Sequence, residues 1–175
     1  MGFEYSLHKN YWSRNIQEEN YKMIKKDLSD GYANHLDTKN IAFESSLLRK
    51  MMFNDTLVNM EDYDLLLRLP IHIKIKFLEE ITVAHHHKEK AWDFFLLQIN
   101  RGYWSYKVSI KHRNSYRYIK NQEIYVSSLS VFISKLINFR LDSKNILFRF
   151  VSGVGWGIGL MLGKIYTLFI NKSAN

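Results

Sequence analysis

A glycine-rich apolar segment near the C-terminus is the strongest constraint on how this chain can fold. The fourteen residues from Phe150 to Gly163 carry no charge, and only Arg149 and Lys164 interrupt the apolar region 146–170. The uncharged run is shorter than the roughly 20 residues that span a bilayer unaided, although a lysine near its end can snorkel and lengthen it. The segment therefore predicts a helix that associates with a membrane or packs closely on the protein.

The glycines of this segment favour the membrane. They form three overlapping pairs of small residues four positions apart, the spacing that lets two helices approach closely: Gly153, Gly155, Gly157, Gly159 and Gly163. Because glycine is a poor helix former in water, we expect a membrane-associated helix over 146–170. It can span the bilayer, re-enter on one side or lie at the interface, and a helix packed on the protein is the alternative.

Positive charge is concentrated in the C-terminal part of the chain. The 175 residues have a net charge of +8; residues 1–100 hold 13 Lys and Arg against 15 Asp and Glu, whereas residues 101–175 hold 12 against 2. Such a region suits an anionic lipid surface, a phosphorylated substrate or nucleic acid, with a solvated basic face as the simplest alternative. The chain has no cysteine, which excludes disulfides, thiolate metal sites and a cysteine nucleophile.

Short strands and helices alternate over the first 110 residues. Helical spacing covers 14–29, which Asp30-Gly31 is expected to end, and 91–106. Other expected elements are strands at 40–43, 71–77 and 81–84, a brief helix capped by Ser45 or Ser46, and a helix at 126–141. The pattern indicates an α/β domain over 1–110, a basic amphipathic helical segment over 111–145 and the apolar helix over 146–170.

An acidic cluster opens a short helix in the α/β region. Glu61, Asp62 and Asp64 precede an apolar run that Pro70 stops, and Asn59 can cap the first free amides. Carboxylates in a first turn are often only caps. Asp64 lies about 200° round the helix from Asp62 and is expected to cap or to face solvent.

Four short motifs follow one another in this region. They are Asp37-Thr38-Lys39-Asn40, Glu61-Asp62, Val83-Ala84-His85-His86-His87 and Gln98-Ile99-Asn100-Arg101-Gly102-Tyr103-Trp104. Their order resembles the C-terminal half of family 2 glycosyltransferases, which are inverting enzymes of the GT-A fold. The resemblance covers roughly residues 15–110 and implies the acceptor-side part of a GT-A domain, followed by C-terminal helices.

The resemblance implies a role for each motif. Asp62 would be the base that takes the acceptor's proton, and Glu61 would orient the acceptor. His85, with His87 as the second choice, would help to hold the Mg²⁺ or Mn²⁺ that neutralises a leaving nucleoside diphosphate. Substrate contacts are expected from a polar and aromatic set: Asn40, Gln98, Arg101, Tyr103 and Trp104. Taken singly, each of these residues also fits an ordinary surface or core role.

The resemblance further implies a nucleotide-binding half that ends in a D-x-D motif. Asp62-Tyr63-Asp64 has this spelling but opens a helix, so we do not assign it to the donor metal. We expect a fragment, a split subunit or a remnant of a transferase, in which catalysis needs a partner chain carrying the donor half. The donor would be a nucleotide-sugar and the acceptor a glycan or lipid-linked saccharide, at the cytoplasmic face of a membrane with an acidic surface.

Two other hypotheses stay open. One is a noncatalytic, membrane-associated interaction protein. The other, less favoured, is a nucleic-acid binder that uses the interleaved basic and aromatic residues of 101–107 and 111–113. A steep loss of nucleic-acid affinity with salt would support the second hypothesis.

Overall fold

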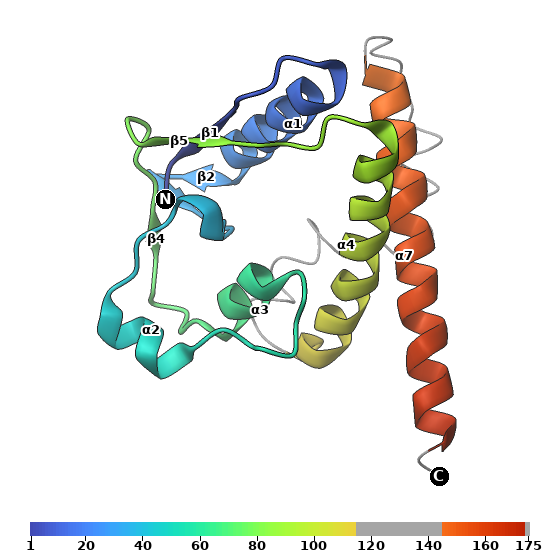
Figure 1. Cartoon of the computed structure of the whole chain (residues 1–175). Coiled ribbons are helices and arrows are strands. Elements are labelled where there is room, and N and C mark those ends of the chain that lie inside the picture. The colour runs from blue at the N-terminus through green and yellow to red at the C-terminus, as the bar shows by residue number, and fades with distance from the viewer. Residues whose placement is uncertain (115–144, 174–175) are drawn as a thin grey trace. The chain divides into compact units, whose positions relative to one another are not determined.

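The computed structural model describes residues 1–114 and 145–173, which divide into two units (Figure 1). The first unit holds residues 1–56 and 61–90, and the second holds 57–60 and the described residues from Ala91 onward. Helices and short strands are mixed along the chain, so the predicted α/β class is confirmed. The helix predicted at 126–141 lies outside the described residues.

Two small sheets organise the first unit. Strand β1 (Phe3–Ser6) runs parallel to β5 (Thr82–His85), with Glu4 opposite Val83 and Ser6 opposite His85. A second sheet has three antiparallel strands in the order β2 (Leu28–Ser29), β3 (Tyr32–Ala33) and β4 (Ile75–Lys76). The parallel pair joins the two ends of the unit's sequence, as the ribbons side by side in Figure 1 show.

Helix α1 (Tyr11–Asp27) begins at a polar cap and packs against β1. The Asn10 side chain accepts a hydrogen bond from the backbone N–H of Ser13 at 2.9 Å, and two lysines in the last turn suit the helix dipole. The predicted helix is confirmed, but Asp30-Gly31 does not end it. Those two residues have φ of 53° and 78° and form the two-residue turn between β2 and β3.

The region after the hairpin departs from two predictions. Residues 40–43 form no strand, because Asn40 is tied to β1 at the end of the 3-10 turn η1 (Thr38–Asn40). The Asn40 side-chain amide donates to the carbonyl of Phe3 at 2.8 Å. The brief helix is present as α2 (Ser45–Met51), but Glu44 occupies its cap position and makes no side-chain capping bond. The strand predicted at 71–77 shortens to β4.

Helix α3 (Glu61–Arg68) buries three consecutive leucines, 65–67, together with one carboxylate. Asp64 is wholly buried, so the expectation that it caps or faces solvent is wrong. Its Oδ2 accepts a hydrogen bond from Nε of Arg68 at 2.8 Å. Arg68 also donates to the carbonyl oxygens of Met51 and Met52 at the end of α2, so this ion pair links the two helices.

Two long helices, α4 (Ala91–His112) and α7 (Ile146–Ser173), pack in parallel in the second unit. Phe94 stacks on Phe148 with ring centroids 4.7 Å apart, and further along both helices Tyr103 meets Tyr166 at 6.0 Å. The predicted helices at 91–106 and 146–170 are therefore confirmed as helices. The segment Ile146–Phe169 is also long and apolar enough to cross a membrane, by length and composition.

Glycines form the seam between these helices. A Cβ added at Gly159 would lie 2.0 Å from the carbonyl oxygen of Ile99, and one added at Gly102 would lie 2.1 Å from that of Trp156. Gly155 and Gly163 also face α4, with closest distances of 2.9 Å. The glycine spacing noted in the sequence thus serves a helix contact within the chain.

The Asp64–Arg68 pair yields a stability prediction. The substitution Arg68→Met leaves a fully buried carboxylate without its guanidinium, which should lower the free energy of unfolding by about 3 kcal/mol. Urea denaturation measures the loss. Arg49→Met is the matched control, because Arg49 is exposed and, within residues 1–114 and 145–173, bonds only to Ser45; it should cost under about 0.5 kcal/mol. Equal losses in the two variants would contradict this role for Arg68.

The glycine seam yields a second prediction. Gly159→Ala should destabilise the pairing of α4 with α7 by roughly 1–3 kcal/mol, because the new methyl meets backbone rather than a movable side chain. Gly163→Ala is the comparison: its methyl would also meet backbone, the carbonyl oxygen of Tyr103, but at 2.9 Å, so the overlap and the loss of stability should be smaller. Thermal unfolding followed by circular dichroism compares them. A Gly159→Ala protein as stable as the wild type would refute this packing.

Candidate metal centre

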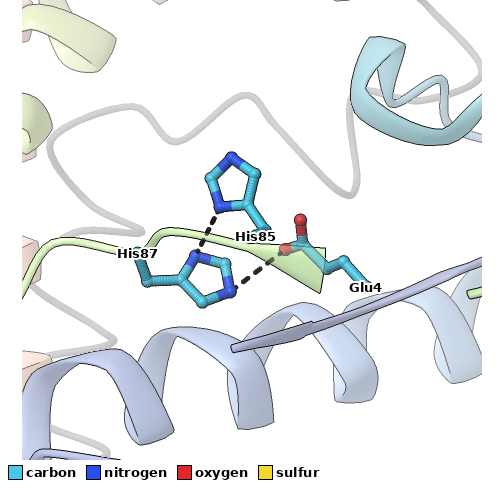
Figure 2. Close-up of side chains that lie close together, drawn as sticks. All are labelled: Glu4, His85 and His87. Carbon is cyan, nitrogen blue, oxygen red and sulfur yellow. Dashed lines mark hydrogen bonds and ion pairs between the residues drawn. The ribbon is translucent and has the colours of Figure 1, made fainter. Parts of the chain in front are cut away.

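Three potential metal ligands, Glu4, His85 and His87, converge beside the parallel strand pair (Figure 2). The strand register explains part of this arrangement. Glu4 lies opposite Val83 and Ser6 opposite His85, so side chains of Glu4 and His85 emerge on the same face of the pair. His87 follows two residues later and returns to the side of His85. His86 points elsewhere and meets His8, with ring nitrogens 2.9 Å apart.

The three side chains are close together and largely shielded from solvent. The Nδ1 atoms of His85 and His87 are 3.2 Å apart, and Nε2 of His87 lies 3.7 Å from Oε1 of Glu4. Glu4 and His87 are buried, whereas His85 is half-buried and leaves the cluster accessible from one side. The three residues can each supply one donor atom, with all three donors within 4.8 Å of one another.

Polar neighbours keep the buried Glu4 ionised. Nζ of Lys39 lies 2.7 Å from Oε2 of Glu4, and the side-chain amide of Asn20 donates to Oε1. Burial works to raise the pKa of Glu4, but the hydrogen bond and charge of Lys39, the hydrogen bond from Asn20 and the charge of His87 outweigh it. The pKa of Glu4 is therefore lowered, and its carboxylate is available as an anionic ligand.

The environment of His85 favours the neutral imidazole. Burial lowers the pKa of His85, and the positive charge of Lys39 lowers it further, against a smaller opposing effect of Glu4. A neutral imidazole offers a lone pair to a metal, whereas a protonated one does not. Glu4 and His85 are thus held in the protonation states that a cation site needs.

The donor set fits a transition metal better than Mg²⁺. Two imidazoles and one carboxylate are typical ligands of Zn²⁺ and related ions, whereas Mg²⁺ prefers oxygen ligands throughout. Two nitrogens bound to one tetrahedral ion at the usual bond length lie about 3.3 Å apart. The 3.2 Å between the two Nδ1 atoms is close to this value, and the carboxylate of Glu4 offers a third donor atom within 4.8 Å of the other two. Of the two ions expected from the sequence, Mn²⁺ fits these residues better.

Glu4 was not among the residues predicted for the site. It lies 81 residues from His85 in the sequence, and no local pattern connects them. The available signal was the alternation in Phe3-Glu4-Tyr5-Ser6, which is typical of a half-buried strand with a carboxylate on one face. Only the pairing of β1 with β5 turns that carboxylate into a neighbour of the histidines.

The other predicted residues of the first unit lie apart from this group. Asp62 and Glu61 are half-buried at the start of α3, where Oδ1 of Asp62 accepts from the backbone N–H of Tyr63 at 2.7 Å. Among the described residues, the group able to share an ion contains neither of these acids. The side chain of Asn40 has a structural role, because its amide donates a hydrogen bond to the carbonyl of Phe3.

The remaining predicted residues lie on α4, in the second unit. Gln98 is buried in the seam beside Gly155, and Arg101 is half-buried. Tyr103 and Trp104 place their rings around Nζ of Lys107, at 4.7 and 4.9 Å. These two aromatics thus have a partner within the helix.

Comparison with known proteins gives no match, whether to a protein-family model, a curated protein or a solved structure.

The lowered pKa of His85 predicts how stability depends on pH. Below its ordinary pKa of about 6.5, the unfolded chain binds a proton that the folded chain resists, so acidification favours unfolding. With a chelator present, the free energy of unfolding should fall between about pH 7.5 and pH 5.5, and His85→Gln should flatten this slope. Urea denaturation at each pH measures it. His72→Gln, at an exposed histidine, should keep the wild-type slope, and an unchanged slope in His85→Gln would exclude this effect.

Proposed function

We propose that this chain is the acceptor-side part of a family 2-like glycosyltransferase and that Glu4, His85 and His87 hold a divalent cation. The cation would neutralise the diphosphate of a nucleotide-sugar as the sugar leaves. A donor-binding segment of the same family, on this chain or on a partner chain, would bind the nucleotide. The acceptor would be a glycan or lipid-linked saccharide at a membrane.

One observation supports the cation site above the others. His85 and His87, the two histidines that the resemblance implies as metal ligands, lie close to the carboxylate of Glu4, which is buried and kept ionised. A buried carboxylate is costly unless it is paired, and here Lys39 and Asn20 occupy only part of its hydrogen-bonding capacity. A cation bound at Oε1 of Glu4 would complete this arrangement and leave coordination positions open to phosphate oxygens.

Asp62 would have a separate task in the transfer reaction. It is half-buried at the N-terminal end of α3, where the helix dipole favours its negative charge. A carboxylate that is ionised and partly exposed can accept the proton of an acceptor hydroxyl as the new glycosidic bond forms. Glu61, beside it in the first turn, would orient the acceptor. Asp64 is already bound to Arg68 and takes no part.

Cation binding can be tested on the chain alone. Titration with Mn²⁺, followed by loss of the free-ion electron paramagnetic resonance signal, should show one site. His87→Ala and Glu4→Gln should each weaken it at least tenfold, because each removes one of three ligands. His86→Ala is the matched control, since its side chain is exposed and meets His8 instead. Unchanged Mn²⁺ affinity in His87→Ala would refute the site.

The transfer step needs a different variant. In a reconstituted reaction that contains the donor-binding segment, Asp62→Asn should reduce release of nucleoside diphosphate by about 100-fold or more, because a general base contributes that much. The same variant should bind Mn²⁺ like the wild type. Asp55→Asn, at an exposed acid, should leave the rate unchanged. Transfer at the wild-type rate by Asp62→Asn would exclude the base role, and nucleoside-diphosphate binding that is insensitive to Mn²⁺ would contradict the role of the cation.

A further inference from the structure

We propose that the α4–α7 pair lies in the plane of an anionic membrane surface, with one face of α7 among the lipid acyl chains, and that α7 does not cross the bilayer. This placement involves the second unit alone and does not depend on the sugar-transfer proposal. It is one of the placements that the sequence of α7 allows.

One side of α7 carries an apolar stripe, much of which is open to solvent. At 100° per residue its exposed members lie within about 60° of one line along the helix, which keeps them on one face: Leu147, Phe150, Ile158, Met161, Leu162, Ile165, Leu168 and Phe169. Phe169 is 70% and Met161 58% exposed, although both would gain from burial. An apolar face of this length on a described helix calls for an apolar environment.

Within the apolar segment Ile146–Phe169, the two charged residues of α7 lie away from this stripe. At 100° per residue, Lys164 is about 100° and Arg149 about 160° from the line through Leu147 and Ile165. Both side chains are exposed. A helix with an apolar face and cations on its other side is typical of a helix that lies at a membrane interface, where the cations contact anionic headgroups.

The glycine seam argues against a spanning α7. Gly102 of α4 meets Trp156, near the middle of the apolar segment Ile146–Phe169, and the two backbones are too close there for any larger residue. An α7 that crossed the bilayer would therefore place Asn100 and Arg101, beside Gly102, near the bilayer centre. Polar and charged side chains are strongly disfavoured at that depth, so the pair is better accommodated at the interface.

A lysine surrounded by aromatic rings further favours an interfacial position. Nζ of Lys107 lies 4.7 Å from the ring centroid of Tyr103, 4.9 Å from that of Trp104 and 4.5 Å from that of Tyr166. Tyr, Trp and Lys are enriched together at the level of lipid headgroups, because their apolar bodies and polar ends suit that boundary. The cluster joins α4 to α7, so both helices share this boundary.

The absence of cysteine makes a direct test possible. Three single-cysteine variants, Arg149→Cys, Lys164→Cys and Ile158→Cys, are bound to preformed vesicles of phosphatidylcholine and phosphatidylserine. They are then treated with a membrane-impermeant maleimide added outside. Positions 149 and 164 are fifteen residues apart, about 22 Å along a helix. A helix in the plane exposes both to the reagent, whereas a spanning helix exposes at most one.

The expected result is rapid labelling at positions 149 and 164, with at least tenfold slower labelling at 158 that depends on vesicles. Protection of either charged position in the bound state would show a spanning or re-entrant helix and overturn the proposal. Protection of position 158 without vesicles would show that protein, from this chain or from another copy, covers the stripe, which also overturns the proposal. Equal labelling rates at position 158 with and without vesicles would also overturn the proposal.

Binding to vesicles provides the second measurement. Ile158→Gln combined with Ile165→Gln should weaken sedimentation with anionic vesicles at least tenfold, because it interrupts the stripe. Ile146→Gln is the matched control, since this exposed isoleucine lies about 100° from Leu147 and should leave binding unchanged. Vesicles of phosphatidylcholine alone should bind the wild type at least tenfold more weakly. Equal binding of the wild type to both vesicle types would contradict an anionic surface. Undiminished binding of the double variant would contradict contact through this face.

Discussion

The buried carboxylate of Glu4 is the constraint on which the first unit depends. An ionised group removed from water requires compensating partners, and three separate segments supply them: Asn20 from α1, Lys39 from η1 and His87 after β5. These segments are far apart in the sequence. The requirement to satisfy one carboxylate thus fixes how the parallel strands, the first helix and the following turn meet, and it places two imidazoles beside an anion.

Local signals predicted most elements but not their partners. The helices α1, α2, α3, α4 and α7 followed from apolar spacing and polar caps, and strand β5 followed from its β-branched residues. The failures have one cause, which is that a long-range contact outweighed a local preference. Asn40 bonds to β1, so no strand begins there. Asp30-Gly31 forms a hairpin turn where a helix end was expected. Asp64 is buried because Arg68 can pair with it.

The candidate site was predictable to a similar extent. Alternation along an extended backbone suggested that His85 and His87 share a side, and their ring nitrogens do meet. Glu4 could not be found in this way, because its role arises from parallel pairing with a strand 81 residues distant. The contacts of Glu4 also affect how tightly a metal could bind. Lys39 already pairs with the carboxylate of Glu4, so its ammonium group and a bound cation would compete for the same negative charge. This competition limits the metal affinity and lets a change at Lys39 adjust it.

The parallel direction of α4 and α7 determines which changes in chain length the second unit tolerates. The contacts advance in the same order along both helices, from Phe94 with Phe148 to Tyr103 with Tyr166. A single residue inserted between Gly159 and Gly163 would disturb this order. It turns the glycines on either side by about 100° relative to one another, so that they can no longer face α4 together.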